Sequence, residues 1–158
     1  MNDRETDIYN DEYETCNRTS VNLLVYTGEE SADMVNSLTG VAATIIRKKG
    51  EVIELSSGRS RVTPLNAWFL LSEDNVDSKD MRRHLDWMIE KINSFNIKLN
   101  ELKSNGYEVR LECIWWSKYN TGGPTVYSRQ LSIIGDFGLD LEFEFAYYGD
   151  EDNDNVSV

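Results

Sequence analysis

Carboxylates at alternating positions are the residues whose spacing in this chain is best suited to chemistry. Asp140, Glu142 and Glu144 recur at every second position, which in a strand places them on one side at separations of roughly 6 to 7 Å. Glu108 and Glu112 share one parity in an earlier strand-like segment. Paired carboxylates at such distances suit glycoside hydrolysis or a divalent cation. We favour a solvated acidic sheet face over catalysis.

The other residue types used in catalysis do not form a recognisable motif. The only histidine, His84, precedes Leu85 on the flank of a helical stripe, which favours a structural histidine over a general base. Cys16 and Cys113 are the only cysteines, too few for a zinc quartet or a disulfide framework. The stretches GEVIELSSGRS and NTGGPT lack the Gly-Lys-Ser/Thr spacing of a phosphate loop. We therefore expect no catalytic residue, no metal, no cofactor and no enzymatic activity.

The formal net charge of −12 limits the kind of partner. It repels nucleic-acid phosphates, so we expect no DNA or RNA ligand, and it favours a basic protein partner. The alternative is that the charge only keeps the protein in solution. The longest apolar run, Ala67 to Leu71, is far shorter than the roughly 20 residues of a membrane helix. The acidic N-terminus does not resemble a secretory signal, so we expect a cytoplasmic protein.

The chain is expected to form one domain flanked by two tails. Residues 1–18 and 150–158 are acidic and nearly free of apolar periodicity, which predicts disordered tails. Residues 19–149 then form a single folded unit, and a chain of this size buries enough surface to fold without disulfides or metals.

The first half of this unit predicts strands and one short helix. Val21–Tyr26 has the composition of a strand, and residues 29–40 begin with acids and close at Gly40, as a short helix does. One or two short strands are expected between residues 44 and 63. Ala67–Ser72 is expected to be a strand buried on both faces.

The strongest periodicity lies between Ser78 and Lys103. Apolar residues spaced alternately four and three apart predict one helix of about seven turns. The same spacing occurs in coiled coils, but a strand follows at once, so packing on the chain's own sheet is favoured. The residues of this stripe are Met81, Leu85, Met88, Ile92, Phe95, Leu99 and Leu102.

Two later segments alternate between apolar and polar residues and predict strands, each with one dry and one wet face. Between them, Ser128–Gly138 is expected to be a short helix that crosses between parallel strands. The expected fold is α+β: a mixed, mostly antiparallel sheet with one long and two short helices packed on one face. The two dry rows are Tyr107, Val109, Leu111, Cys113 and Trp115, and Leu139, Leu141, Phe143, Phe145 and Tyr147.

The parity of the first of these strands predicts a binding surface. Trp116 points away from the dry row, toward the side of Glu108 and Glu112, and Tyr119 and Tyr127 stand in the adjacent loop. An exposed tryptophan among acids and tyrosines is typical of a protein-binding hot spot surrounded by steering charge. The candidate partner-binding residues are Trp116, Tyr119, Tyr127, Glu108, Glu112, Asp140, Glu142 and Glu144. The alternative is that a helix or a tail covers this face.

A second hypothesis places a small ligand in an aromatic pocket. Its lining is Trp68, Trp115 and Tyr127 together with the basic turn Arg47, Lys48 and Lys49. With Arg59 and Arg61, that turn forms a basic cluster, which we interpret as a solvated turn in preference to a site for an acidic ligand. A third hypothesis is an oligomerising domain whose open sheet edge pairs with a second copy.

Several motifs together resemble an uncharacterised bacterial family, the domain of unknown function 4279. In order, they are TGVAATIIRKKGE, NAWFLLSED, LNELKSNGYEVRLECIWWS and GGPTVYSRQLSIIGDFGLDLEFEFAYYG, and the resemblance covers residues 21–149. The chain departs from the family pattern because it lacks the usual proline and tryptophan just after Gly40. The resemblance implies the fold, and it supplies no catalytic residues. The matching positions are Gly40, Lys49, Gly50, Trp68, Ser72, Cys113, Trp115, Trp116, Ser117, Gly122, Gly123, Gly138 and Tyr148.

The function that the sequence favours is a non-enzymatic module that binds a basic protein. The concrete form of this hypothesis is an immunity-type inhibitor of a bacterial toxin, because a nuclease toxin must be basic to hold its substrate and an acidic inhibitor can occupy that site. The sequence leaves the oligomeric state open.

Overall fold

A computed structural model of the chain describes residues 8–147. Its strands are β1 (Cys16–Gly28), β2 (Ile45–Arg47), β3 (Val52–Glu54), β4 (Ser60–Val62), β5 (Asn66–Leu71), β6 (Glu108–Ser117) and β7 (Leu141–Tyr147). Its helices are α1 (Asp33–Thr39), α2 (Met81–Asn93), α3 (Leu99–Ser104) and α4 (Ser128–Asp136).

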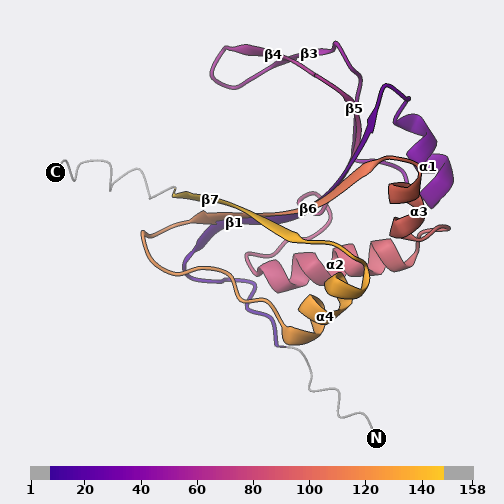
Figure 1. Cartoon of the computed structure of the whole chain (residues 1–158). Coiled ribbons are helices and arrows are strands. Elements are labelled where there is room, and N and C mark those ends of the chain that lie inside the picture. The colour runs from indigo at the N-terminus through magenta and orange to yellow at the C-terminus, as the bar shows by residue number, and fades with distance from the viewer. Residues whose placement is uncertain (1–7, 148–158) are drawn as a thin grey trace, which may run out of the picture.

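Five strands form one twisted sheet in the order β2-β5-β1-β6-β7. All neighbours are antiparallel except β6 and β7, which run parallel because α4 carries the chain back between them. The helices pack on one face of the sheet, and the β3–β4 hairpin rises as an arm on the other side (Figure 1). The α+β class and the mixed, mostly antiparallel sheet are as predicted, but residues 8–147 contain four helices where one long and two short helices were predicted.

The core lies between the sheet and α2. The inward row of β6 that alternation predicted is correct, since Leu111, Cys113 and Trp115 are all at most 1 % exposed. Leu85 and Met88 of α2 are equally buried. Burying each large apolar side chain contributes about 1.5–3 kcal/mol, so this layer supplies most of the packing that fixes the sheet.

The single long helix predicted for residues 78–103 is wrong, because the chain breaks into α2 and α3. After Asn93 the backbone N–H of Asn96 donates to the carbonyl of Thr39 (2.9 Å) rather than continuing the helix. The ring of Phe95 packs edge-on against Trp68, with ring centroids 6.2 Å apart. The apolar period is kept across the break, and these tertiary contacts outweigh local helix propensity.

The predicted boundary of the N-terminal tail is also wrong. Cys16 is 1 % exposed and begins β1, where it pairs with Ser117 of β6. Residues 8–15 lie against the helices and the loop before α4, and the hydroxyl of Tyr13 donates to the carbonyl of Gly123 (3.1 Å). The tail predictions for residues 1–7 and 150–158 fall outside the described residues.

The dry row predicted for β7 is buried only at its beginning. Leu139 is 6 % exposed, whereas Phe143, Phe145 and Tyr147 are 41 %, 63 % and 56 % exposed. The reason is the position of β7 at the edge of the sheet. The described helices cover only the beginning of this strand, and its second half extends past them (Figure 1). The aromatic rings of that half are therefore exposed to solvent.

Candidate protein-binding surface

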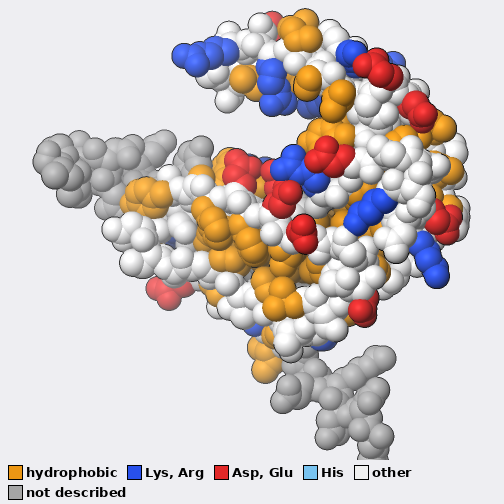
Figure 2. Space-filling model, in the orientation of Figure 1, with side chains coloured by type: hydrophobic (Ala, Val, Ile, Leu, Met, Phe, Trp, Pro, Cys, Tyr) orange, Lys and Arg blue, Asp and Glu red, His pale blue; other side chains and the backbone are white. Residues whose placement is uncertain are grey.

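The parallel register of β6 and β7 assembles an acidic face on the open side of the sheet. Glu112 pairs with Glu142 and Ile114 with Glu144, and paired residues point to the same side. Glu112 lies between the buried residues Leu111 and Cys113, and the β6–β7 register places Glu142 and Glu144 on the same side as Glu112, so these carboxylates point away from the helices. Figure 2 shows acidic side chains gathered around a basic one beneath the arm. We define the acidic face by Glu108, Glu112, Trp116, Glu142 and Glu144.

The charge of this face is only partly compensated. Arg110 donates from Nε and Nη2 to Oε2 of Glu142, at 2.8 and 2.5 Å, and this hydrogen bonding raises the pKa of the arginine. Glu112 accepts a hydrogen bond from Nδ2 of Asn22 (3.3 Å). Among the described residues, the exposed side chains of Glu108 and Glu144 have no hydrogen-bond or ion-pair partner. Asp140 is exposed just before β7.

Trp116 lies on the open side, as parity predicted. It pairs across the sheet with Arg18, whose guanidinium carbon is 4.3 Å from the centroid of the indole. Nε of Arg18 donates to Glu73 (2.5 Å). The tryptophan is therefore half-buried under a cation rather than fully open, and a partner that reaches its ring must displace or include Arg18.

The two tyrosines predicted to flank this face separate. Tyr119 is 40 % exposed in the loop that follows β6. Tyr127 lies on the helix side, where the guanidinium carbons of Arg82 and Arg129 are 4.7 and 5.3 Å from the centroid of its ring. Its placement beside the acidic face was wrong, because the loop turns from the sheet to the helix layer before α4 begins.

The aromatic pocket proposed from the sequence does not form. Trp68 and Trp115 are both 0 % exposed and lie on β5 and β6, with β1 between these strands. Each indole N–H is satisfied within the core: Trp68 donates to Oδ1 of Asn36 (2.7 Å), and Trp115 donates to Oγ of Ser117 (3.0 Å). Both are packing residues.

Part of the basic cluster lines a cavity beneath the arm instead. Arg47 and Arg61 meet the rings of Tyr26 and Phe69 around a space of about 250 Å³. Lys49 forms an ion pair with Glu29, and Lys48 is exposed. Sequence reasoning missed the two rings, because nothing in their local pattern reveals that the arm folds over them.

His84 is buried with a serine in an arrangement that serves the fold. Its Nε2 donates to the carbonyl of Ser78 (2.7 Å), because a carbonyl can only accept, so Nδ1 accepts from the hydroxyl of Ser72 (2.7 Å). Ser72 is 0 % and His84 1 % exposed. The Ser72 oxygen also accepts from the backbone N–H of Val21 (2.8 Å). The two side chains therefore have almost no surface exposed to solvent.

Within residues 8–147, no group of three or more histidine, cysteine or acidic side chains is arranged to hold a metal ion. In the same part of the chain, every helix is too short or too polar to cross a membrane. Cys16 and Cys113 are buried free thiols.

The family model described as "Domain of unknown function (DUF4279)" matches residues 14–148. The chain belongs to this family. The match includes every strand and helix of the described structure. It begins within the N-terminal segment that precedes β1. Comparisons with curated proteins and with solved structures returned no match.

In this DUF4279 domain, the motif positions that carried the resemblance have structural roles. Trp68, Ser72, Cys113 and Trp115 are all 0 % exposed. Gly40 adopts a left-handed backbone (φ 74°), and a Cβ there would lie 2.5 Å from Nδ2 of Asn96. These motifs therefore specify the core and its turns. Of the residues that define the acidic face, only Trp116 is one of the matching positions.

Proposed function

We propose that this protein is a non-enzymatic binding module whose acidic face binds a basic protein. The observation that carries the proposal is that Glu108 and Glu144 are exposed on the open side of the sheet and, among the described residues, form no hydrogen bond or ion pair, although Arg110 lies within electrostatic range of Glu108. Trp116 on the same side provides an aromatic contact. Exposed carboxylates steer a basic partner, and Trp116, at the other end of β6 from Glu108, adds an aromatic contact that helps to fix its orientation.

The specific form of the proposal is an immunity-type inhibitor of a bacterial toxin that acts in the cytoplasm. A nuclease toxin presents basic residues to nucleic-acid phosphates, and an acidic sheet face can cover those residues. The net charge of −12 favours such an encounter. The unpaired buried thiols of Cys16 and Cys113 suit a reducing compartment.

One observation favours a second candidate, a small acidic ligand. The cavity of about 250 Å³ beneath the arm combines two guanidinium groups, Arg47 and Arg61, with aromatic and aliphatic walls. Such a lining suits an aliphatic or aromatic carboxylate. Under this alternative, octanoate or phenylpropanoate raises the melting temperature of the wild type and not of Arg61→Gln.

Capture from the native host with three baits tests the leading proposal. The first is the wild type and the second carries Glu108→Lys and Glu144→Lys. The third carries Glu12→Lys and Glu90→Lys, at exposed acids outside the open side of the sheet. Both variants change the net charge equally, so any difference between them reports position rather than total charge.

The acidic-face variant is expected to lose a basic protein that the wild type and the control variant retain. Equal loss by both variants would show that binding depends on net charge rather than on this face, and equal retention would show that the face is not used.

The immunity form is tested separately. The captured protein should stop growth when expressed alone and permit growth when this chain is co-expressed, and a harmless partner would contradict that form alone.

A further inference from the structure

Strand β7 combines an open edge with two chemically different rows of side chains. It is the last strand in the sheet order, and β6 is its neighbour. Within residues 8–147, no strand pairs with its other edge. An edge strand offers a row of backbone N–H and C=O groups to which an extended segment can bind.

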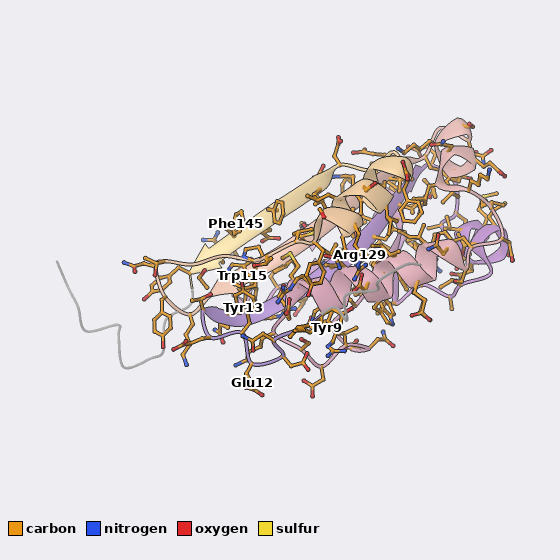
Figure 3. The ribbon with its side chains drawn as sticks, turned by 90° about the horizontal axis from the view of Figure 1, so that it is seen from below. Tyr9, Glu12, Tyr13, Trp115, Arg129 and Phe145 are labelled. Carbon is orange, nitrogen blue, oxygen red and sulfur yellow. The ribbon has the colours of Figure 1, made fainter. Side chains whose placement is uncertain are left out.

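The row of β7 on the helix side is aromatic. Phe143 and Phe145 stack with ring centroids 5.4 Å apart and planes 7° from parallel, and Tyr147 continues the row. The three side chains are 41 %, 63 % and 56 % exposed. Figure 3 shows Phe145 at the margin of the sheet, outside the helices. Natural edge strands are usually protected by charges or proline, whereas this row presents a flat apolar surface that a neighbouring strand would cover.

The opposite row of β7 is acidic. Glu142 and Glu144 alternate with the aromatic residues, and Glu144 has no described partner. A strand added beside β7 would therefore meet rings on one side and carboxylates on the other, at cross-strand Cβ distances of about 4.5–5.5 Å. The segment that matches both rows alternates apolar residues with lysine or arginine.

We propose that β7 accepts such an alternating basic and apolar segment of the partner as an added edge strand. This inference rests on the proposed function and specifies how the partner is held. Backbone hydrogen bonds supply affinity, and the two rows supply register, because a slip of one residue would place lysines on the phenylalanine rings and apolar groups on the glutamates.

Charge argues against a second copy of this chain as the occupant. Antiparallel pairing of two β7 strands centred on Glu144 sets that residue against itself. Centring on Phe143 sets Glu142 against Glu144 of the other copy. Like charges directly opposite each other destabilise a strand pair, and each copy carries a net charge of −12. A basic strand removes both conflicts.

The test uses the full chain and two peptides of identical composition with blocked ends, the alternating KVKIKVKIK and the block sequence KKKKKVVII. The alternating peptide is expected to bind at least about tenfold more tightly and to slow hydrogen exchange in the backbone of Glu142–Tyr147. Methylation of alternate peptide nitrogens should abolish that preference. Phe145→Lys should weaken binding about tenfold, corresponding to a few cross-strand contacts. The matched control is Leu131→Lys, on α4, where the side chain is 51 % exposed.

Equal affinity for the two peptides, or protection elsewhere in the chain, would overturn the added-strand inference. A wild-type dimer that dissociates on Phe145→Lys would also overturn it, because a second copy would then occupy the edge. In either case, if the native partner is still lost on Glu108→Lys with Glu144→Lys, the proposed function stands without this mode of binding. Failure of that charge-reversal experiment would instead refute the proposed function.

Discussion

The ring of Tyr13 packs edge-on against the indole of Trp115, with centroids 5.2 Å apart and planes at 87°. Trp115 is a central core residue, and Tyr13 belongs to the segment that precedes the sheet. This contact makes the N-terminal segment a cover for one end of the core. The fold therefore depends on residues whose acidic composition suggested a tail.

Substitution of Tyr13 measures that dependence. Tyr13→Phe keeps the ring and removes the hydrogen bond to Gly123, so we expect a loss of about 1 kcal/mol in the free energy of unfolding. Tyr13→Ala also removes the ring contact, so a loss of about 2–3 kcal/mol is expected. Urea denaturation monitored by tryptophan fluorescence measures both. Equal stability of Tyr13→Ala and wild type would show that the segment is not part of the folded unit.

Glycine substitutions test how closely the N-terminal segment packs against the loop before α4. Gly122 has φ +91°, and a Cβ there would lie 2.8 Å from Cβ of Thr15. Gly58 has φ +79° with open space around it. Alanine at either site costs about 1–2 kcal/mol in backbone strain, and we expect Gly122→Ala to cost about 1–3 kcal/mol more through the clash. Thermal unfolding of the two variants compares them, and indistinguishable losses would remove the close approach of Thr15 from the account.

Acid titration tests the buried histidine. Burial lowers the pKa of His84 below its ordinary value near 6.5, against the opposing effect of its hydrogen bond to Ser78. Below about pH 6.5 the unfolded chain binds a proton that the folded chain resists, so the free energy of unfolding should fall as the pH drops. Hydrogen bonds from Ser78 and Arg83 hold the pKa of Asp11 below its usual range. The contribution of this carboxylate to the free energy of unfolding is therefore lost only below about pH 4.

The variant His84→Gln separates these contributions. It removes the only histidine, so the dependence of unfolding free energy on pH between about 5.5 and 7 should flatten, whatever its absolute stability. Denaturation series at several pH values give this slope. A slope unchanged from the wild type would show that His84 is not held neutral by burial.

The cysteines should be inert in the folded protein. Burial raises the pKa of Cys16 to about 11 and that of Cys113 to about 12, so thiolate is scarce at neutral pH. We expect a disulfide reagent such as DTNB to label neither thiol in native buffer and both in urea. Rapid native labelling of Cys16 would show that the start of β1 opens readily.

The alternation of β6 was enough to predict its orientation. β6 lies between β1 and β7, and its inward residues Leu111, Cys113 and Trp115 are buried, so side-chain parity and burial agree there. For the same reason, Trp116 was correctly placed on the open side. The parity of the glutamates predicted that those of each strand share one side of the sheet. The predicted crossover helix implied that the two strands run parallel.

Local pattern failed where tertiary context decides the outcome. The alternation of β7 matches that of β6, yet Phe145 is exposed because β7 is an edge strand, and strand order is not encoded in local periodicity. The apolar residues of α2 and α3 keep one helical period, although the helix is interrupted between them. The interruption coincides with a hydrogen bond from Asn96 to Thr39, which is remote in sequence and cannot be read from the local pattern. Tyr127 was predicted beside the acidic face but lies on the helix side, because the local sequence of a loop does not determine the direction that the loop takes.

The affinity of the captured basic partner for three forms of this chain, at about 50 and about 200 mM salt, tests the acidic face most directly. The wild type and the Glu12→Lys, Glu90→Lys control should both lose at least about tenfold in affinity at the higher salt, through screening. The Glu108→Lys, Glu144→Lys variant should bind weakly at both concentrations and lose most of that salt dependence. Binding by all three forms with the same affinity and the same salt dependence would contradict the assignment of partner binding to this face.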